Sequence, residues 1–469
     1  MKTTGILLLL SLVVFFPSIS SGQAFQNTTQ AKLSNGLKVI LLENHKAPII
    51  SFQVWYRAGA RNERVGKTGL AHVLEHMMFK GTEKVSGENF HRMIDDLGGE
   101  ENAFTAHDYA GYYETVAADR IGVPLELESD RMKNLILKES DFQTERKVVI
   151  EERRTRIEDN PQAFLLEQLD SAAYQSQPYH WPVIGWPEDI ERLTIEDVQA
   201  FYTTHYNPSN AFLVVTGDFN TKKLLAELEK TFGGIPAGTP VSQFSIQDPP
   251  QTGERRVMVQ RPTQVGTVCV AYHVPNLRTP DSYVLEVIRA ILSEGKSSRL
   301  YEHVVHSRAL AVEATADYSL VSVDPSLFYL TASVLPEKSM TEVENALYDE
   351  LERLKKIPVD ARELEKAKNQ LEATFVFDQD SLFSLGQNLA EYETASDWSA
   401  ISNYLPSIRS VSAEDIRRVA SKYFTPQNRT VGTLIATGPS SQAPAKSTGG
   451  AKDRTIRLRS SQGAMELRQ

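Results

Sequence analysis

Cysteine is nearly absent from this chain of 469 residues, which contains only Cys269. A single thiol cannot form a disulfide within the chain, so the fold depends on its packed core rather than on cross-links. Cys269 lies in the apolar run Val268-Cys-Val-Ala-Tyr272, where a small buried side chain is expected. Catalysis by a cysteine nucleophile is therefore not predicted.

Long hydrophobic runs are also missing after the first few residues, because no later segment approaches the roughly 20 apolar residues of a membrane-spanning helix. The N-terminal segment has Lys2, an apolar run over 6–16 and a small, polar stretch that ends at Ala24. This pattern predicts a secretory signal peptide over residues 1–24. With one basic residue it does not fit an Arg-rich mitochondrial transit peptide, and no cysteine is present there for a lipid anchor. We expect a periplasmic or secreted protein without a stable membrane span.

Positively charged residues are fewer than negatively charged ones, and the net charge is −10. Residues 439–469 hold six Lys or Arg and two Asp or Glu, which gives them +4, and with Lys2 also set aside residues 25–438 carry −15. Nucleic-acid binding rests on clustered positive charge, so no nucleic-acid partner is expected. An acidic body is compatible with cationic peptide substrates. Residues 439–469 are poor in apolar side chains and are predicted to be a disordered tail.

The most specific pattern that is present is His72-Val-Leu-Glu75-His76. At about 100° per residue, the two histidines and the glutamate fall on one face of a helix. Histidines one turn apart can bind the same Zn²⁺, and H-x-x-E-H is the inverzincin order of a zinc-hydrolase motif. The glutamate between them is placed to act as a base. The alternative is that these histidines only cap or pack the helix.

A catalytic zinc site needs a third protein ligand. The segment Asp141–Arg154 has a helical pattern, with Val148 and Val149 expected to face inward and Glu145 and Glu152 on one face. One carboxylate of that face could reach the metal, while another could hydrogen-bond a ligating histidine. The alternative is a solvated helix stabilised by Glu and Arg pairs.

An internal repeat indicates the architecture. The segment Glu196-Asp-Val198 with Tyr206-Asn-Pro208-Ser-Asn210 returns, 218 positions later, as Glu414-Asp-Ile416 with Phe424-Thr-Pro426-Gln-Asn428. We predict an α+β fold of two homologous domains, each with helices packed on a mostly antiparallel sheet. Expected elements include a strand over 49–56 and helices over 341–355 and 360–375. The predicted boundaries are a first domain over 25–235, a linker over 236–252 and a second domain over 253–438, which lacks a metal motif.

These motifs resemble the pitrilysin-like zinc metallopeptidases of family M16, which include insulin-degrading enzyme and mitochondrial processing peptidase. The similarity extends to the later E-R-x-V-V-x-x-E segment, to Gly98-Gly-Glu-Glu-Asn102-Ala-Phe-Thr105 and to Pro178-Tyr-His-Trp-Pro182. The resemblance implies a Zn²⁺ cofactor and a zinc-dependent endopeptidase acting on peptides or unfolded proteins. It implies that His72, His76 and Glu152 are the metal ligands. Glu75 is then the general base, and Glu145 is the supporting carboxylate. Glu151 competes with Glu152 as third ligand, and Glu152 is preferred because it closes the segment that starts at Glu145.

The resemblance also implies how substrate and partners are held. Asn102, Ala103 and Phe104 are expected on an edge strand beside the zinc, to which an extended peptide can add. Members of this size pair with themselves or with a motif-less homologue, so a homodimer or heterodimer is expected. Arg299 and Tyr301 are candidate substrate contacts but equally fit a packing role. The alternative function is a non-catalytic scaffold or zinc-binding subunit of the same fold that requires a partner.

Overall fold

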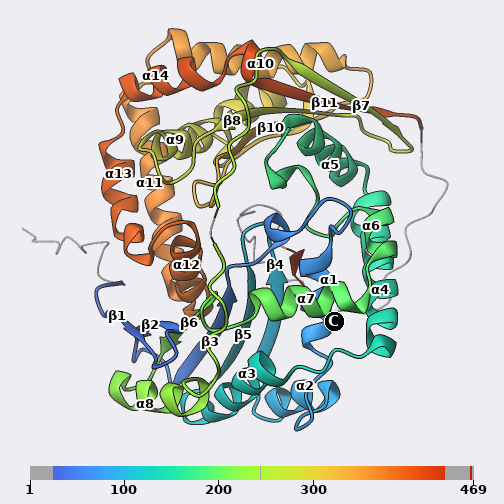
Figure 1. Ribbon diagram of the computed structural model, residues 1–469. Coiled ribbons are helices and arrows are strands. Elements are labelled where there is room, and N and C mark those ends of the chain that lie inside the picture. The colour runs from blue at the N-terminus through green and yellow to red at the C-terminus, as the bar shows by residue number, and fades with distance from the viewer. Residues whose placement is uncertain (1–24, 243, 439–464, 467–469) are drawn as a thin grey trace, which may run out of the picture.

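The computed structural model describes residues 25–242, 244–438 and 465–466 (Figure 1). The predicted signal peptide over 1–24 and residues 439–464 and 467–469 of the predicted tail lie outside these described residues. None of the helices in the described part of the chain combines the length and the apolar composition of a membrane-spanning segment.

The first half of the chain is built on a sheet with the strand order β1-β2-β6-β3-β5-β4-β12. Its central strand, Ile49–Tyr56, pairs with neighbours on both edges and is buried from its second residue onward, because the core of the first half covers one face and α12 (Leu382–Ala395) packs against the strand. The pair β2 and β6 is parallel and the other pairs are antiparallel. The strands are β1 (Thr28–Lys32), β2 (Lys38–Glu43), β3 (Ile49–Tyr56), β4 (Glu100–Thr105), β5 (Ala110–Ala117), β6 (Ala211–Gly217) and β12 (Met465–Glu466).

Eight α-helices belong to the same part of the chain within the described residues. They are α1 (Leu70–Met78), α2 (Gly87–Asp95), α3 (Gly122–Asn134), α4 (Glu139–Arg153), α5 (Pro161–Ala173), α6 (Pro187–Arg192), α7 (Ile195–His205) and α8 (Thr221–Phe232). Capping defines several starts, as where the Thr194 hydroxyl accepts from the Asp197 amide at the beginning of α7.

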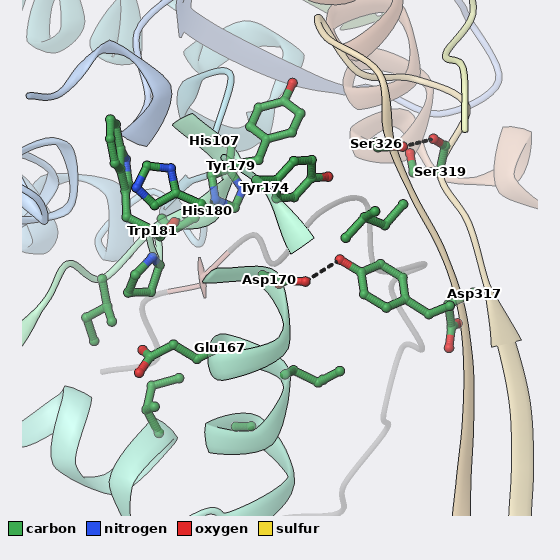
Figure 2. Close-up of a pocket in the computed structure, with 18 of the residues that line it drawn as sticks. His107, Glu167, Asp170, Tyr174, Tyr179, His180, Trp181, Asp317, Ser319 and Ser326 are labelled. Atoms are coloured by element: carbon green, nitrogen blue, oxygen red, sulfur yellow. Dashed lines mark hydrogen bonds between the residues drawn. The ribbon is translucent and has the colours of Figure 1, made fainter. Parts of the chain in front are cut away.

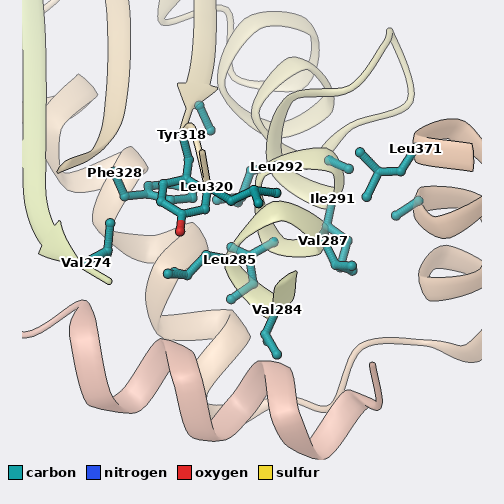
Figure 3. Close-up of a cluster of buried hydrophobic side chains, with 14 of the residues drawn as sticks. Val274, Val284, Leu285, Val287, Ile291, Leu292, Tyr318, Leu320, Phe328 and Leu371 are labelled. Carbon is teal, nitrogen blue, oxygen red and sulfur yellow. The ribbon is translucent and has the colours of Figure 1, made fainter. Parts of the chain in front are cut away.

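The second half repeats the plan with the order β7-β11-β8-β10-β9, in which β7 and β11 are the parallel pair. Its helix α9 is apolar on the side that covers the sheet, and Figure 3 shows Leu285 and Leu292 beside Phe328 and Tyr318, with Ile291 on the side of Leu371. The strands are β7 (Arg255–Arg261), β8 (Thr267–Val274), β9 (Ala311–Asp317), β10 (Ser326–Val334) and β11 (Arg429–Ala436). The helices are α9 (Asp281–Ser293), α10 (Met340–Lys356), α11 (Ala361–Phe377), α12 (Leu382–Ala395), α13 (Tyr404–Ser410) and α14 (Ala413–Tyr423).

The sequence repeat is visible in the sheets. The central strand β3 and its counterpart β8 begin at Ile49 and Thr267, and β6 and β11 begin at Ala211 and Arg429, so both pairs keep the 218-residue shift. Each sheet has the same neighbour order around these strands and one parallel pair. The predicted α+β fold of two homologous, mostly antiparallel halves is confirmed.

The two halves exchange a helix. In Figure 1, α5 of the first half lies against the second sheet, where it contacts β7 and β11, and α12 of the second half lies against β3 and β6. Leu165 and Leu169 of α5 pack in one apolar cluster with Val259 and Leu434 of the second sheet. In return, the Leu382 carbonyl in α12 accepts a hydrogen bond of 2.7 Å from the Thr216 hydroxyl of β6. Each core is therefore completed by the other half of the chain.

One prediction needs correction, and one strand pairing was not predicted. Val148 was expected to face inward, but its side chain is 45% exposed, because the buried face of α4 follows the helical spacing of Phe142, Glu145 and Val149. Met465 and Glu466, which belong to the segment predicted to be a disordered tail, pair with β4. The pairing lies on the edge of β4 that faces away from β5, where a further strand can add to the sheet.

Candidate metal centre and peptide-binding edge

Helix α1 carries the H-x-x-E-H motif, and all of its residues are buried. It starts at Gly69, whose φ of 86° favours glycine. A Cβ at Gly69 would lie 2.6 Å from the Ile184 carbonyl oxygen, so the absence of a side chain lets the helix start approach the 184–185 turn closely. The Glu63 carboxylate accepts the backbone amides of Gly69 and Ala71 at 2.9 and 2.7 Å, which ties down the helix start.

Three side chains converge beside this helix. Glu152 Oε2 lies 3.3 Å from His76 Nε2 and 3.8 Å from His72 Nε2, and the three potential ligand atoms are within 4.8 Å of one another. Two ligands of one tetrahedral zinc, each about 2.0–2.1 Å from it, are separated by roughly 3.4 Å. His72 Nε2 is buried without a hydrogen-bond partner among the described residues, and His76 Nε2 faces the Glu152 carboxylate. Two imidazoles and a carboxylate at this spacing fit a zinc ion.

The carboxylates of α4 take different positions. Glu145 Oε2 lies 3.0 Å from His76 Nδ1, the ring nitrogen that faces away from the cluster, and Lys80 holds Oε1 of the same carboxylate at 2.6 Å. Glu151 is exposed and forms an ion pair with Arg154, outside the cluster. The structure therefore brings Glu152 rather than Glu151 to the histidines, with Glu145 orienting one ring.

Glu75 lies between the histidines and is fully buried. The Thr105 hydroxyl of β4 donates a short hydrogen bond to Glu75 Oε2, while Oε1 has no hydrogen-bond partner among the described residues. Burial raises the pKa of Glu75 to about 8, although the Thr105 hydrogen bond opposes this shift. A carboxylate with a pKa near neutrality and one free oxygen is suited to exchanging a proton.

The two histidines have opposite electrostatic environments in the metal-free protein. Burial lowers the pKa of His72 to about 3, so this imidazole is neutral. Burial also disfavours the charged form of His76, but hydrogen bonds to Glu145 and Glu152 outweigh it and raise its pKa to about 9. A metal ion would replace the proton of His76, because ligating imidazoles bind in the neutral form.

The predicted substrate residues Asn102, Ala103 and Phe104 lie on β4, which is hydrogen-bonded to β5 along one of its two edges. Ala103 and Phe104 have buried side chains, and the Phe104 ring packs 5.1 Å from the ring of Trp55. The Asn102 side-chain oxygen accepts from the Ala103 amide at 2.8 Å. Contacts from β4 to a peptide would thus be made by the main chain, which suits strand addition.

A pocket of about 380 Å³ lies between the halves (Figure 2). Figure 2 shows Tyr174, Tyr179 and Trp181 on one side, with Asp170 of α5 nearby, and Asp317 and Ser326 from the second half on the other. Ile157 and Ile184 also line the pocket. Ile157 comes just after α4, the helix that carries Glu152, and Ile184 lies against the start of α1. The pocket therefore adjoins the elements that carry the metal cluster.

The other candidates do not join the cluster. Arg299 pairs with Glu363 of α11 at 2.7 Å, and Tyr301 starts a helical turn after it, which fits the packing interpretation. His107 Nε2 lies 3.1 Å from the Trp181 carbonyl oxygen and lines the pocket.

Sequence reasoning missed four supporting residues of the site: Glu63, Lys80, Thr105 and Arg156. Two of them had a readable signal, since Lys80 follows His76 by one helical turn and Arg156 follows Glu152 in the same way. Arg156 Nε lies 3.0 Å from Glu152 Oε1. The contact of Thr105 with Glu75 depends on tertiary packing and had no local signal.

Comparison with known proteins identifies the family of the chain. Residues 38–185 match the family described as Insulinase (Peptidase family M16), and residues 192–371 match the one described as Peptidase M16 inactive domain. Zinc protease PqqE of Helicobacter pylori is 32% identical over 397 residues, which cover 84% of this chain and 89% of that protein. The probable mitochondrial-processing peptidase subunit beta of Arabidopsis thaliana is 26% identical, covering 85% and 76%.

A solved structure gives the same result in three dimensions. The crystal structure of a protease from Helicobacter pylori has a TM-score of 0.83 and 31% identity, and the match covers 87% of this chain and 99% of that one. Fold and motif thus define a zinc-protease-like protein of two α+β halves. The chain belongs to peptidase family M16, which confirms the resemblance inferred from the sequence.

Proposed function

We propose that the protein is a zinc-dependent endopeptidase that cleaves extended peptides or unfolded proteins in the periplasm or outside the cell. The observation that carries the proposal is the convergence of His72, His76 and Glu152 around one point, with the buried Glu75 beside them and the edge strand β4 next to Glu75. The signal-like segment over 1–24 supports the location.

His72, His76 and Glu152 would hold the zinc ion, and Glu145 would keep the His76 ring oriented through Nδ1. Bound zinc would supply an activated water molecule and polarise the scissile carbonyl group. Glu75 would take up a proton on its free oxygen and then donate it to the amine nitrogen that leaves. The Thr105 hydroxyl holds the other oxygen, which leaves Glu75 one orientation for both transfers.

Substrate recognition would depend on β4 and the pocket between the halves. Main-chain pairing with β4 demands an extended peptide but little of its sequence. A folded protein presents few such segments, whereas peptides and unfolded chains present many. The second half, which lacks the motif, contributes one wall of the pocket.

A second candidate function is a non-catalytic scaffold or zinc-binding subunit that works only with a partner, either another copy or a motif-less homologue. One relative is named as a subunit of a mitochondrial-processing peptidase, which favours pairing. Against the scaffold stands the complete set of His72, Glu75, His76 and Glu152, since a scaffold has no need for a buried base.

The test is cleavage of a quenched-fluorescent peptide mixture by the protein without residues 1–24. Turnover that a chelator abolishes and that added zinc restores supports the endopeptidase. Stoichiometric zinc without turnover, either alone or with added partner subunit, supports the zinc-binding scaffold instead.

A further inference from the structure

The C-terminal segment of the chain returns to the candidate site. Met465 and Glu466 form β12, which pairs antiparallel with β4, as the short red arrow beside β4 in Figure 1 shows. Met465 is opposite Thr105 and Glu466 is opposite Phe104. Thr105 is also the residue whose hydroxyl contacts Glu75. The end of the chain thus lies on the strand that borders the motif helix.

This edge cannot hold two strands at once. The opposite edge of β4 is bonded to β5 from Glu100 to Thr105, so an added peptide must use the backbone groups that face β12. Each backbone amide donates one hydrogen bond in a sheet ladder. A substrate that extends along β4 as far as Thr105 therefore has to displace β12.

We propose that the segment around Met465 and Glu466 is a reversible occupant of the peptide-binding edge and competes with substrate there. The inference rests on the proposed function, because it takes β4 to be the strand that receives substrate. Its effect is to raise the concentration of peptide that is needed to fill the site.

Charge and tethering favour this occupant. Residues 439–469 carry +4 and residues 25–438 carry −15, so the segment is attracted to the body of the protein. Residues 439–464 connect it to the end of the second half, and a tethered segment reaches an effective concentration of about a millimolar. Pairing of only two residues is weak, so a longer peptide can displace it.

The first measurement is the binding of a labelled peptide to Glu75→Gln protein, in which binding is separated from cleavage. We expect a protein that lacks residues 439–469 to bind the peptide about threefold or more tightly than the full chain, by fluorescence anisotropy. The synthetic 439–469 peptide should compete with the label on the truncated protein. Equal affinity of the two proteins, or no competition, overturns the proposal.

A matched pair of variants separates pairing from charge. Met465→Pro combined with Glu466→Pro removes the backbone donors of β12 and keeps the length of the segment, so it should reproduce the effect of truncation. Ser447→Pro combined with Thr448→Pro places the same two prolines earlier in the segment and should behave like the full chain. If both pairs act alike, strand pairing is not the cause and the proposal is wrong.

Hydrogen exchange distinguishes this inference from the proposed function. Backbone amides of β4 should exchange faster in the truncated protein than in the full chain, whether or not the protein cleaves peptides. If β4 exchanges faster in the truncated protein but neither protein binds peptide, the pairing of β12 with β4 is supported. The proposed endopeptidase function and the competition with substrate are then both refuted. Unchanged exchange of β4 would overturn the contact itself.

Discussion

The hydroxyl of Thr105 donates a hydrogen bond to the Glu75 carboxylate, and this contact links the edge strand β4 to the motif helix α1. Both side chains are buried, so water does not replace the bond. A substrate strand paired at Thr105 would consequently lie next to the group that we propose as the base. Thr105 therefore connects the strand proposed to bind substrate with the carboxylate proposed as the base.

The first prediction concerns this contact. Thr105→Val removes the hydroxyl with little change in volume, so Glu75 loses its positioning partner. We expect kcat for a quenched peptide to fall about 10-fold or more, with zinc content unchanged. Thr105→Ser keeps the hydroxyl and should retain most of the activity. A valine variant with normal kcat would show that Glu75 does not need Thr105.

A second prediction separates the two adjacent carboxylates of α4. Glu152→Gln removes a negatively charged group from the cluster and should abolish stoichiometric zinc binding, as metal analysis after dialysis would show. Glu151→Gln is the matched control, because Glu151 is exposed and pairs with Arg154. Loss of zinc in the Glu151 variant and its retention in the Glu152 variant would reverse the assignment.

Glu145 should act through His76. Glu145→Gln removes the charge that faces His76 Nδ1, so we expect zinc affinity to fall about 10- to 100-fold while the stoichiometry at saturating zinc stays the same. Competition with a fluorescent chelator measures this directly. An unchanged dissociation constant would exclude a supporting role for Glu145.

The contact between the halves predicts a large loss of stability. Arg61 is 2% exposed and its guanidinium lies 2.6 Å from Asp324 of the second half and 3.3 Å from Asp108. Arg61→Met leaves these buried carboxylates without their cation, which should cost about 3–5 kcal/mol in the free energy of unfolding by urea. Arg154→Met, at an exposed ion pair, should change the free energy of unfolding much less. Equal effects would mean that the Arg61 pairs contribute little.

Asp281 predicts an acid-dependent loss of stability. Burial opposes ionisation, but hydrogen bonds from Lys422, Arg418 and Tyr423 prevail and lower its pKa to about 2. A carboxylate with a lowered pKa stabilises the fold above its unfolded pKa of about 3.9, and the contribution disappears as the pH falls toward 2.

Asp281→Asn should accordingly lower the free energy of unfolding by about 1–2 kcal/mol at pH 6, after allowance for the half-exposed Lys422 and Arg418. The difference from the unchanged protein should shrink between pH 4 and pH 2. Glu414→Gln, at an exposed pair on the same helix as Arg418, serves as control and should change stability by less than about 0.5 kcal/mol. A difference that does not depend on pH would contradict this assignment.

Local patterns predicted much of this structure. The strand expected over 49–56 is β3, and the helices expected over 341–355 and 360–375 are α10 and α11 with ends shifted by one or two residues. The spacing of His72, Glu75 and His76 placed all three on one face, because helical periodicity alone determines it. The internal repeat predicted two similar halves, because each copy of the repeat carries its own local turn and strand signals.

Contacts between distant segments were not predictable in this way. The sequence of α5 does not specify which sheet the helix covers, and only tertiary packing shows that Leu165 and Leu169 cover the sheet of the other half. The inward face of α4 was wrong at Val148, because two adjacent apolar residues do not specify which one is buried. The pairing of Met465 with Thr105 likewise depends on an edge that exists only in the assembled sheet.

The most direct test of the account uses the unchanged protein and Glu75→Gln side by side, with zinc content and peptide cleavage measured on the same samples. We predict one zinc per chain in both proteins, chelator-sensitive cleavage by the first, and a loss of cleavage of at least about a thousandfold in the variant. Cleavage by Glu75→Gln at the rate of the unchanged protein would contradict the role of Glu75 and with it the proposed mechanism.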